Sequence, residues 1–162
     1  MKLYRREISI VKSIKIDKNG ISIFFLSNQN SCRSQMAEAI LRSFDKELEI
    51  YSAGIEPVDH ISPVAIEVLT DIGVKLEQSV PDHYSKYEHI EFDYLITVGD
   101  GTIENLKIPS TIKFKRKMHL GFQNPYKHFK DRNELKEKCC EIRDEIYIEL
   151  DYFYHRIIKK EE

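Results

Sequence analysis

Apolar and polar positions along the chain follow two periods, and their alternation predicts strands and helices in turn. Short apolar runs at residues 21–26, 48–53, 92–98 and 111–114 contain β-branched and aromatic residues, as strands of a parallel sheet do. Between and after these runs, apolar residues spaced three or four apart predict three helices. The helices cover Ser34–Phe44, the segment from Pro63 to Gly73, and a long final stretch that begins at Asp131.

Local signals support the ends and faces of these helices. Ser62 is a favourable cap, Pro63 suits the first helical position, and Gly73 suits the residue after the last turn. The expected apolar faces are Met36, Ala37, Ile40, Leu41 and Phe44; then Val64, Ile66, Val68, Leu69 and Ile72; and finally Leu135, Cys139, Ile142, Ile146, Leu150, Phe153 and Ile157.

Strands that alternate with helices predict an α/β fold with a parallel sheet, here in one domain over residues 21–162. Residues 1–20 form an N-terminal extension, either an extra strand or an arm. Isoleucines alternate loosely there, and Asn19-Gly20 is a turn signal that favours a hairpin into the strand at 21–26.

Composition excludes some classes of partner. The chain has 162 residues and a formal net charge of -2, so no strong field favours nucleic acid or an anionic membrane. No apolar run is long enough to span a bilayer, and the N-terminus lacks a signal-peptide pattern, so a cytoplasmic protein is expected. The basic cluster Lys113, Lys115, Arg116 and Lys117 is interpreted as a solvated strand edge.

The first apolar run ends abruptly in a short polar loop, residues 27–34, which is followed by a helix. Such a loop directs backbone N–H groups inward, and the helix N-terminus adds partial positive charge. Arg33 adds a planar set of donors suited to a tetrahedral oxyanion. We expect the oxyanion to be bound by Asn28, Gln29, Asn30, Ser31, Cys32, Arg33 and Ser34, with Ser27 facing it.

This loop resembles that of low-molecular-weight protein tyrosine phosphatases and of arsenate reductases with the same fold, which reads Cys-x-Gly-Asn-x-Cys-Arg-Ser. Asn30, Cys32, Arg33 and Ser34 match it. Further segments with a likeness to the family are 35–38, 52–55, 63–69, 92–98, 119–125 and 142–146. The resemblance covers residues 21–157 and implies a three-layer, doubly wound sandwich around a four-stranded parallel sheet.

The reactive groups that the resemblance implies are replaced. Ser27 stands at the position of the family's nucleophilic cysteine, and Asn124, before Pro125, at that of its general acid. Asn124 is expected to cap a turn instead. The cysteines of the arsenate-reductase relay have no counterpart after the third strand; Cys139 is expected to be a buried small hydrophobe and Cys32 to pack within the loop.

Two further positions bear on the site. Gln29 replaces the family's glycine, a residue that permits positive φ or close approach of a ligand, and a Gln29 side chain inside the pocket would fill it. The resemblance also implies a potassium ion beside the loop, held by Asn30, Glu38, Ser52 and Asp82, all of which carry oxygen atoms. The alternative is that Glu38 and Asp82 only fix the shape of the loop.

Three functions remain open from the sequence. The first is a catalytically inactive relative, with or without a regulatory role, that binds an oxyanion or a phosphorylated protein through residues 27–34. The second is an active arsenate reductase or tyrosine phosphatase, if Ser27 is an engineered replacement of cysteine; the simultaneous changes at Ser27, Asn124 and the relay favour a natural change instead. The third is an interaction scaffold that binds no small ligand.

Overall fold

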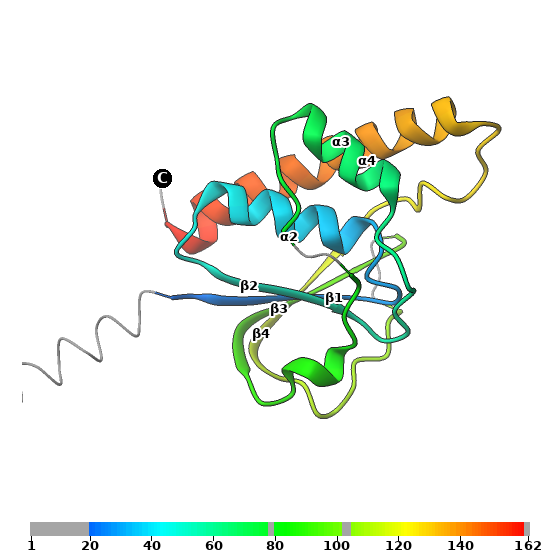
Figure 1. Cartoon of the computed structure of the whole chain (residues 1–162). Helices are drawn as coiled ribbons and strands as arrows, with labels where there is room; N and C mark the ends of the chain where they lie inside the picture. Colours follow the sequence, from blue (N-terminus) through cyan, green and yellow to red (C-terminus); the bar gives the residue numbers. More distant parts are fainter. Residues whose placement is uncertain (1–19, 78–79, 102–104, 161–162) are drawn as a thin grey trace, which may run out of the picture.

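The computed structural model describes residues 20–77, 80–101 and 105–160 (Figure 1). The N-terminal hairpin expected before residue 20 lies outside this range. Secondary-structure elements are labelled as in Figure 1.

A four-stranded parallel sheet forms the centre of the fold, with the strand order β2-β1-β3-β4. The strands are β1 (Ser22–Ser27), β2 (Glu49–Gly54), β3 (Glu91–Gly99) and β4 (Lys113–Gly121). β1 pairs with β2 on one side and with β3 on the other, so Leu26 lies opposite both Ala53 and Thr97. The loop that follows β1 therefore starts at the middle of the carboxyl edge of the sheet, where ligands of open α/β sheets bind.

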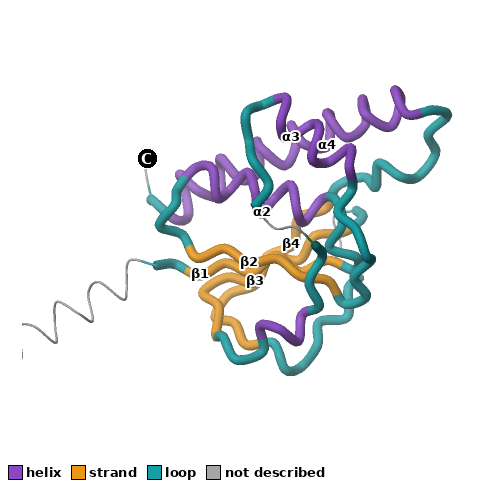
Figure 2. Tube along the Cα trace, viewed as in Figure 1, coloured by secondary structure: helices purple, strands orange, loops and turns teal. Residues whose placement is uncertain are grey.

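Three helices lie together on one face of the sheet: α2 (Arg33–Phe44), α3 (Pro63–Asp71) and α4 (Arg132–Tyr152) (Figures 1 and 2). A wider π-helical turn, η2 (Phe153–Ile158), extends α4. The opposite face carries the short 3-10 helix η1 (Tyr84–Tyr87) and loop segments. The four-stranded parallel α/β fold is thus confirmed, with η1 and loops as the third layer.

The burial of β1 shows that both faces of the sheet are covered. All six of its residues are buried. Ile23 and Phe25 pack into the core on the helical side, whereas Phe24 and Leu26 pack into a second cluster with Phe92. Phe24 stacks on Phe92 with the ring centroids 4.6 Å apart. Alternation of side chains along a strand makes this double burial possible, as the apolar run predicted.

Most predicted elements are found within one or two residues of their expected ends, and the clearest error concerns β4. That strand was expected over residues 111–114 but runs over Lys113–Gly121. It is one of the two edge strands, and it carries four exposed basic residues: Lys113, Lys115, Arg116 and Lys117. The expectation of a solvated strand edge is confirmed, and Lys115 pairs with Asp93 at 3.0 Å.

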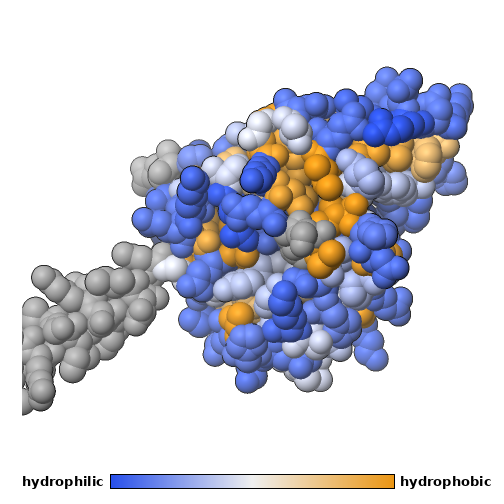
Figure 3. Space-filling view, viewed as in Figure 1, coloured by the Kyte–Doolittle hydropathy of each residue, from blue (hydrophilic) through white to orange (hydrophobic). Residues whose placement is uncertain are grey.

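The expected apolar face of the final helix is confirmed. Six of its seven predicted residues are buried and the last is partly buried: Leu135, Cys139, Ile142, Ile146, Leu150, Phe153 and Ile157. The expected face of α3 is partly wrong, because Ile66 and Ile72 are 43% and 38% exposed. In the space-filling view the surface is mostly hydrophilic, and apolar surface gathers near α2 and α3 (Figure 3). Among the described residues, no helix has the length and apolar character needed to cross a membrane.

Candidate anion-binding site

The loop between β1 and α2 has its carbonyl groups turned outward. The carbonyl oxygens of five consecutive residues, 27–31, accept hydrogen bonds from outside the loop at 2.8–3.3 Å. The donors are, in order, the backbone N–H groups of Ile55, Glu56 and Val58, the side-chain amide of Gln35, and the backbone N–H of Ser62.

This arrangement fixes the direction of the N–H groups. A trans peptide places its carbonyl and the next N–H on opposite sides, and the described residues contain no cis peptide. The N–H groups of residues 28–32 therefore face the inside of the loop. The Asn30 N–H shows this directly, because it donates to Ser27 Oγ at 3.0 Å. Together with the N-terminus of α2, the loop forms a concave cluster of donors suited to an anion.

Gly54, the last residue of β2, allows the close packing that holds the loop from outside. A Cβ atom at this position would lie 2.7 Å from the Asn28 carbonyl oxygen and 3.1 Å from the Asn30 nitrogen. Any larger residue would therefore displace the loop backbone. Three of the residues that follow, Ile55, Glu56 and Val58, donate their N–H groups to the carbonyls of residues 27–29.

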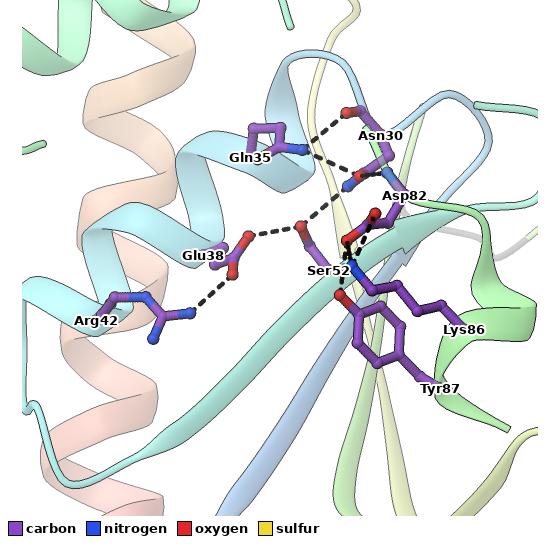
Figure 4. A network of polar contacts seen from close by, with 8 residues as sticks. All are labelled: Asn30, Gln35, Glu38, Arg42, Ser52, Asp82, Lys86 and Tyr87. Atoms are coloured by element: carbon purple, nitrogen blue, oxygen red, sulfur yellow. Dashed lines mark hydrogen bonds and ion pairs between the residues drawn. The ribbon is translucent and has the colours of Figure 1, made fainter. Parts of the chain in front are cut away.

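The left-handed turn in the loop occurs at Asn30, with φ of 52°, and not at Gln29. Asparagine tolerates this conformation better than most residues. Its Nδ2 donates to Ser34 Oγ at 3.1 Å. The same Nδ2 donates to Ser52 Oγ at 3.0 Å, and the Oδ1 accepts from Gln35 Nε2 at 3.0 Å (Figure 4). The side chain of Gln29 is exposed. The substitution of glycine at position 29 is therefore compatible with the turn.

The four residues predicted to hold potassium do lie together, and Figure 4 shows all of them. Ser52 Oγ donates to Glu38 Oε2 at 2.6 Å, and the Asp82 N–H donates to Asn30 Oδ1 at 3.0 Å. Burial raises the pKa of Glu38, although its hydrogen bonds from Ser52 and Arg42 oppose this effect.

In this arrangement, however, the two carboxylates of the set have other partners. Arg42 Nη2 donates to Glu38 Oε1 at 2.8 Å, and Lys86 Nζ lies 3.1 Å from Asp82 Oδ2. Both carboxylates are thus already paired with side-chain cations, as in the alternative that Glu38 and Asp82 fix the loop. One buried acceptor, Gln35 Oε1, has no hydrogen-bond partner in the described part of the chain, and a single neutral oxygen does not hold a cation. The potassium ion stays a prediction.

Arg33, the first residue of α2, is held at the rim of the loop by two acceptors. Its Nη1 donates to Asp100 Oδ1 at 2.5 Å and to the Phe122 carbonyl at 2.8 Å. Asp100 also accepts from Lys127 Nζ at 2.7 Å. The hydrogen bond from Lys127 lowers the pKa of Asp100, partial burial opposes this, and Arg33 lowers the pKa further. Asp100 is therefore an ionised carboxylate beside the anion loop.

Ser27 lies at the bottom of the loop, at the end of β1. Its hydroxyl is hydrogen-bonded to Ser34 Oγ at 2.8 Å and accepts from the Asn30 N–H. Neither group is a base that could take the serine proton, which activation of a hydroxyl nucleophile requires.

Asn124 lines the same cavity but serves a turn. Its Oδ1 accepts from the Tyr126 N–H at 3.0 Å, and its carbonyl accepts from the Lys127 N–H at 3.1 Å. The expected turn-capping contact at Asn124 is therefore present, and its amide group is not a proton donor of the general-acid kind.

A cavity of about 270 Å³ remains over the loop. Residues 27–34 form one side of it. The remaining lining comes from the end of β3, the segment between β3 and β4, and the segment after β4: Val98, Gly99, Asp100, Asn105, Leu106, Asn124 and Tyr126. The structure thus brings every residue of the predicted loop to one cavity, together with Asn124. Sequence reasoning missed Asp100 and Tyr126; the position of Asp100 just after a parallel strand was the available signal.

The geometry defines a class of protein: an α/β protein whose first strand, loop and helix form a pocket with inward-facing backbone N–H groups. Comparison with known proteins narrows the class. The family model for low molecular weight phosphotyrosine protein phosphatases matches residues 22–161, and the chain belongs to this family.

Related sequences support the same family, and solved structures share the fold. Arsenate reductase from Shouchella clausii is 32% identical over 129 residues, covering 76% of this chain and 88% of that protein. Arsenate reductase 1 from Staphylococcus epidermidis is 31% identical over 137 residues, covering 84% and 97%. Among solved structures, an arsenate reductase in the phosphate binding state has a TM-score of 0.68 at 18% identity, covering 85% and 98%. Vibrio vulnificus Wzb in complex with benzylphosphonate has a TM-score of 0.66 at 18% identity, covering 85% and 99%.

Proposed function

We propose that this chain binds a tetrahedral oxyanion, free or as the phosphate of a phosphorylated protein, in the loop 27–34 and does not turn it over. The observation that carries the proposal is the set of five outward carbonyls, which directs the N–H groups of residues 28–32 inward. Arg33 at the start of α2 and the helix N-terminus add positive charge at the same place.

Three observations support the proposed absence of turnover. Among the described residues, the Ser27 hydroxyl is hydrogen-bonded to Ser34 Oγ and the Asn30 N–H, and neither group is a base. Asn124 is an amide engaged in a turn. Asp100, the carboxylate that lines the cavity, has a lowered pKa and so keeps no proton to donate to a leaving group near neutral pH.

A phosphorylated side chain has room to enter. The cavity over the loop adjoins a second, wider depression, and the two share Asn28, Asn105 and Leu106. Apolar side chains such as Ile55, Tyr84 and Ile108 line this second depression, and they suit residues that flank a phosphorylated one. The Gln29 side chain is exposed and leaves the cavity open, which favours a ligand over the scaffold without one.

The binding part of the proposal is tested by calorimetric titration of the full chain with phosphate, sulfate and arsenate. We expect saturable binding that Arg33→Ala abolishes and Arg33→Lys weakens, since lysine lacks the planar set of donors. Arg132→Ala is the matched control, because Arg132 lies away from the loop and pairs with Glu67 on the surface. Absence of heat with all three anions would contradict oxyanion binding.

The catalytic part needs its own assay. A chromogenic aryl phosphate, and arsenate with a thiol reductant, are incubated with the wild-type chain. We expect no turnover above that of the Ser27→Ala variant. Turnover that Ser27→Ala removes would show instead an active enzyme and would overturn this part of the proposal without affecting the binding result.

A further inference from the structure

Two buried thiols from distant parts of the chain meet beneath the anion loop. Cys32 immediately precedes α2, and Cys139 lies among the buried residues of α4, a helix that packs against α2. Both are free cysteines in the same hydrophobic core cluster, with exposures of 8% and 0%. The two thiols interact: Cys139 raises the pKa of Cys32, and Cys32 lowers the pKa of Cys139.

Polar groups of two other segments complete this cluster. The Ser62 hydroxyl, which caps α3, acts to lower the pKa of the Cys32 thiol and is hydrogen-bonded to the Tyr126 hydroxyl. The charges of both thiols in turn act on the Tyr126 phenol. Cys32, Cys139, Ser62 and Tyr126 are thus one group, at which the anion loop, α3, α4 and the segment after β4 converge.

The cavity over the anion loop reaches one thiol of the pair. Cys32 and Tyr126 line this cavity, whereas Cys139 is fully buried and does not line it. A small neutral oxidant that enters the cavity therefore reaches Cys32 first, with Cys139 placed to react second. The third cysteine, Cys140, is the next residue on α4 and is partly buried.

We propose that Cys32 and Cys139 are a modification site, at which a hydroperoxide that enters the anion cavity produces a reversible disulfide between the loop and α4. This inference does not depend on the proposed function, because it requires no bound anion.

The chemistry balances in two steps. The Cys32 sulfur attacks the hydroperoxide, the O–O bond breaks, and Cys32 becomes a sulfenic acid while the oxidant leaves as water or an alcohol. The Cys139 sulfur then attacks the Cys32 sulfur, the S–O bond breaks, and the second oxygen leaves as water. Two thiols have lost two electrons and two protons, which the peroxide has taken up.

The environment makes this reaction slow and selective. The interaction with Cys139 and then burial raise the pKa of the Cys32 thiol, while Arg33 acts in the opposite direction. Only a small fraction is thiolate near neutral pH, and the thiolate is the reactive form. A buried partner in contact favours closure to the disulfide over further oxidation of the sulfenic acid.

The experiment uses the reduced full chain, hydrogen peroxide and peptide mapping without reductant. Trypsin cleaves after Lys18, Arg33, Lys138 and Arg143, which yields peptide 19–33 with Cys32 and peptide 139–143 with Cys139 and Cys140. We expect the two peptides to be covalently linked after oxidation and to separate on addition of dithiothreitol. Cys32→Ser and Cys139→Ser should lose the link.

Cys140→Ser is the decisive variant and the matched control. It retains only Cys32 and Cys139, so an intramolecular disulfide in its monomer can have no other connectivity. A link preserved in Cys140→Ser supports the site, even if Cys139→Ser fails to fold. A link that Cys140→Ser abolishes, or Cys32 recovered as a sulfinic acid without any link, would overturn it.

Discussion

Arg33 of the anion loop is paired with Asp100 at 2.5 Å, so the arginine that should anchor an incoming anion already has a carboxylate partner. The two residues are 67 positions apart, and they meet because β1 and β3 are neighbours in the sheet. Asp100 thus acts as an internal competitor at the rim of the pocket, while its bond to Lys127 keeps it in place.

The first prediction follows from that pair. Asp100→Asn removes a negative charge beside the loop and releases Arg33, so phosphate should bind more tightly. Partly exposed ion pairs contribute about 1 kcal/mol at most, which corresponds to roughly fivefold in affinity. Calorimetric titration at low and high salt checks this, and the gain should shrink as salt screens the charges. Asp151→Asn, on the exposed side of α4, has the same charge change and should have no effect. Equal or weaker binding by Asp100→Asn would argue against competition.

A second prediction concerns the missing chemistry. Ser27→Cys places a thiol at the end of β1, where the inward N–H groups and the N-terminus of α2 favour the thiolate. Combined with Asn124→Asp, it should hydrolyse an aryl phosphate. General acids contribute about 10²–10⁴-fold, so the double variant should exceed Ser27→Cys alone by roughly 100-fold or more. Single-turnover and steady-state rates measure the difference. If the double variant is as inactive as Asn124→Asp alone, the loop lacks more than these two groups.

The ion pair of Arg42 and Glu38 provides a third prediction. Arg42→Gln leaves a buried carboxylate without its cation, and a cost of about 1–3 kcal/mol in unfolding free energy is expected, below the full cost for a buried pair because Arg42 is partly exposed. Thermal and denaturant unfolding measure it, with Arg132→Gln as the control.

The same variant tests the cation site. If a small cation can replace the guanidinium, potassium chloride should restore more of the stability of Arg42→Gln than tetramethylammonium chloride does. Equal effects of the two salts would remove the case for a cation site.

The same variant has a defined pH dependence. Burial raises the pKa of Glu38 in the folded chain, so the folded state holds its proton more tightly than the unfolded state. Such a group costs stability as the pH rises from its unfolded pKa through its folded pKa, and this cost is absent at lower pH. Without Arg42 the shift grows, so the deficit of Arg42→Gln relative to the wild type should be smaller near pH 5 than near pH 7. Melting curves at both values measure it, and a deficit that grows at pH 5 would contradict this sign.

The left-handed residue in the loop yields a final prediction. Asn30→Gly keeps the φ of 52° accessible but loses the side-chain bonds to Ser34 and Ser52, whereas Asn30→Ala also strains the backbone. The alanine variant should unfold about 1 kcal/mol more easily than the glycine variant. Denaturant unfolding resolves this difference. If the two variants are equally stable, the loop does not require the left-handed conformation.

The sequence predicted the sheet, the three helices and the loop because each has a local signal: an apolar run, a helical stripe or a cap. β4 was misplaced because an edge strand needs no apolar run, and its lysines obscured the pattern. The pairing of Arg33 with Asp100 and the contact of Cys32 with Cys139 depend on strand order and helix packing, which no local pattern encodes. The bond between Glu38 and Arg42 is different, since their four-residue spacing on one helix was visible in the sequence.

The carbonyls of the anion loop are bound by the backbone after β2, by the cap of α3 and by Gln35, rather than by residues inside the pocket. The contacts that hold the loop backbone are therefore separate from the side chains at the positions of the family's reactive groups. The side chains of Ser27 and Asn124 can therefore change without any change in the contacts that hold the loop backbone. If the proposed function is correct, an inactive chain and an active relative differ at a few side chains over the same loop backbone.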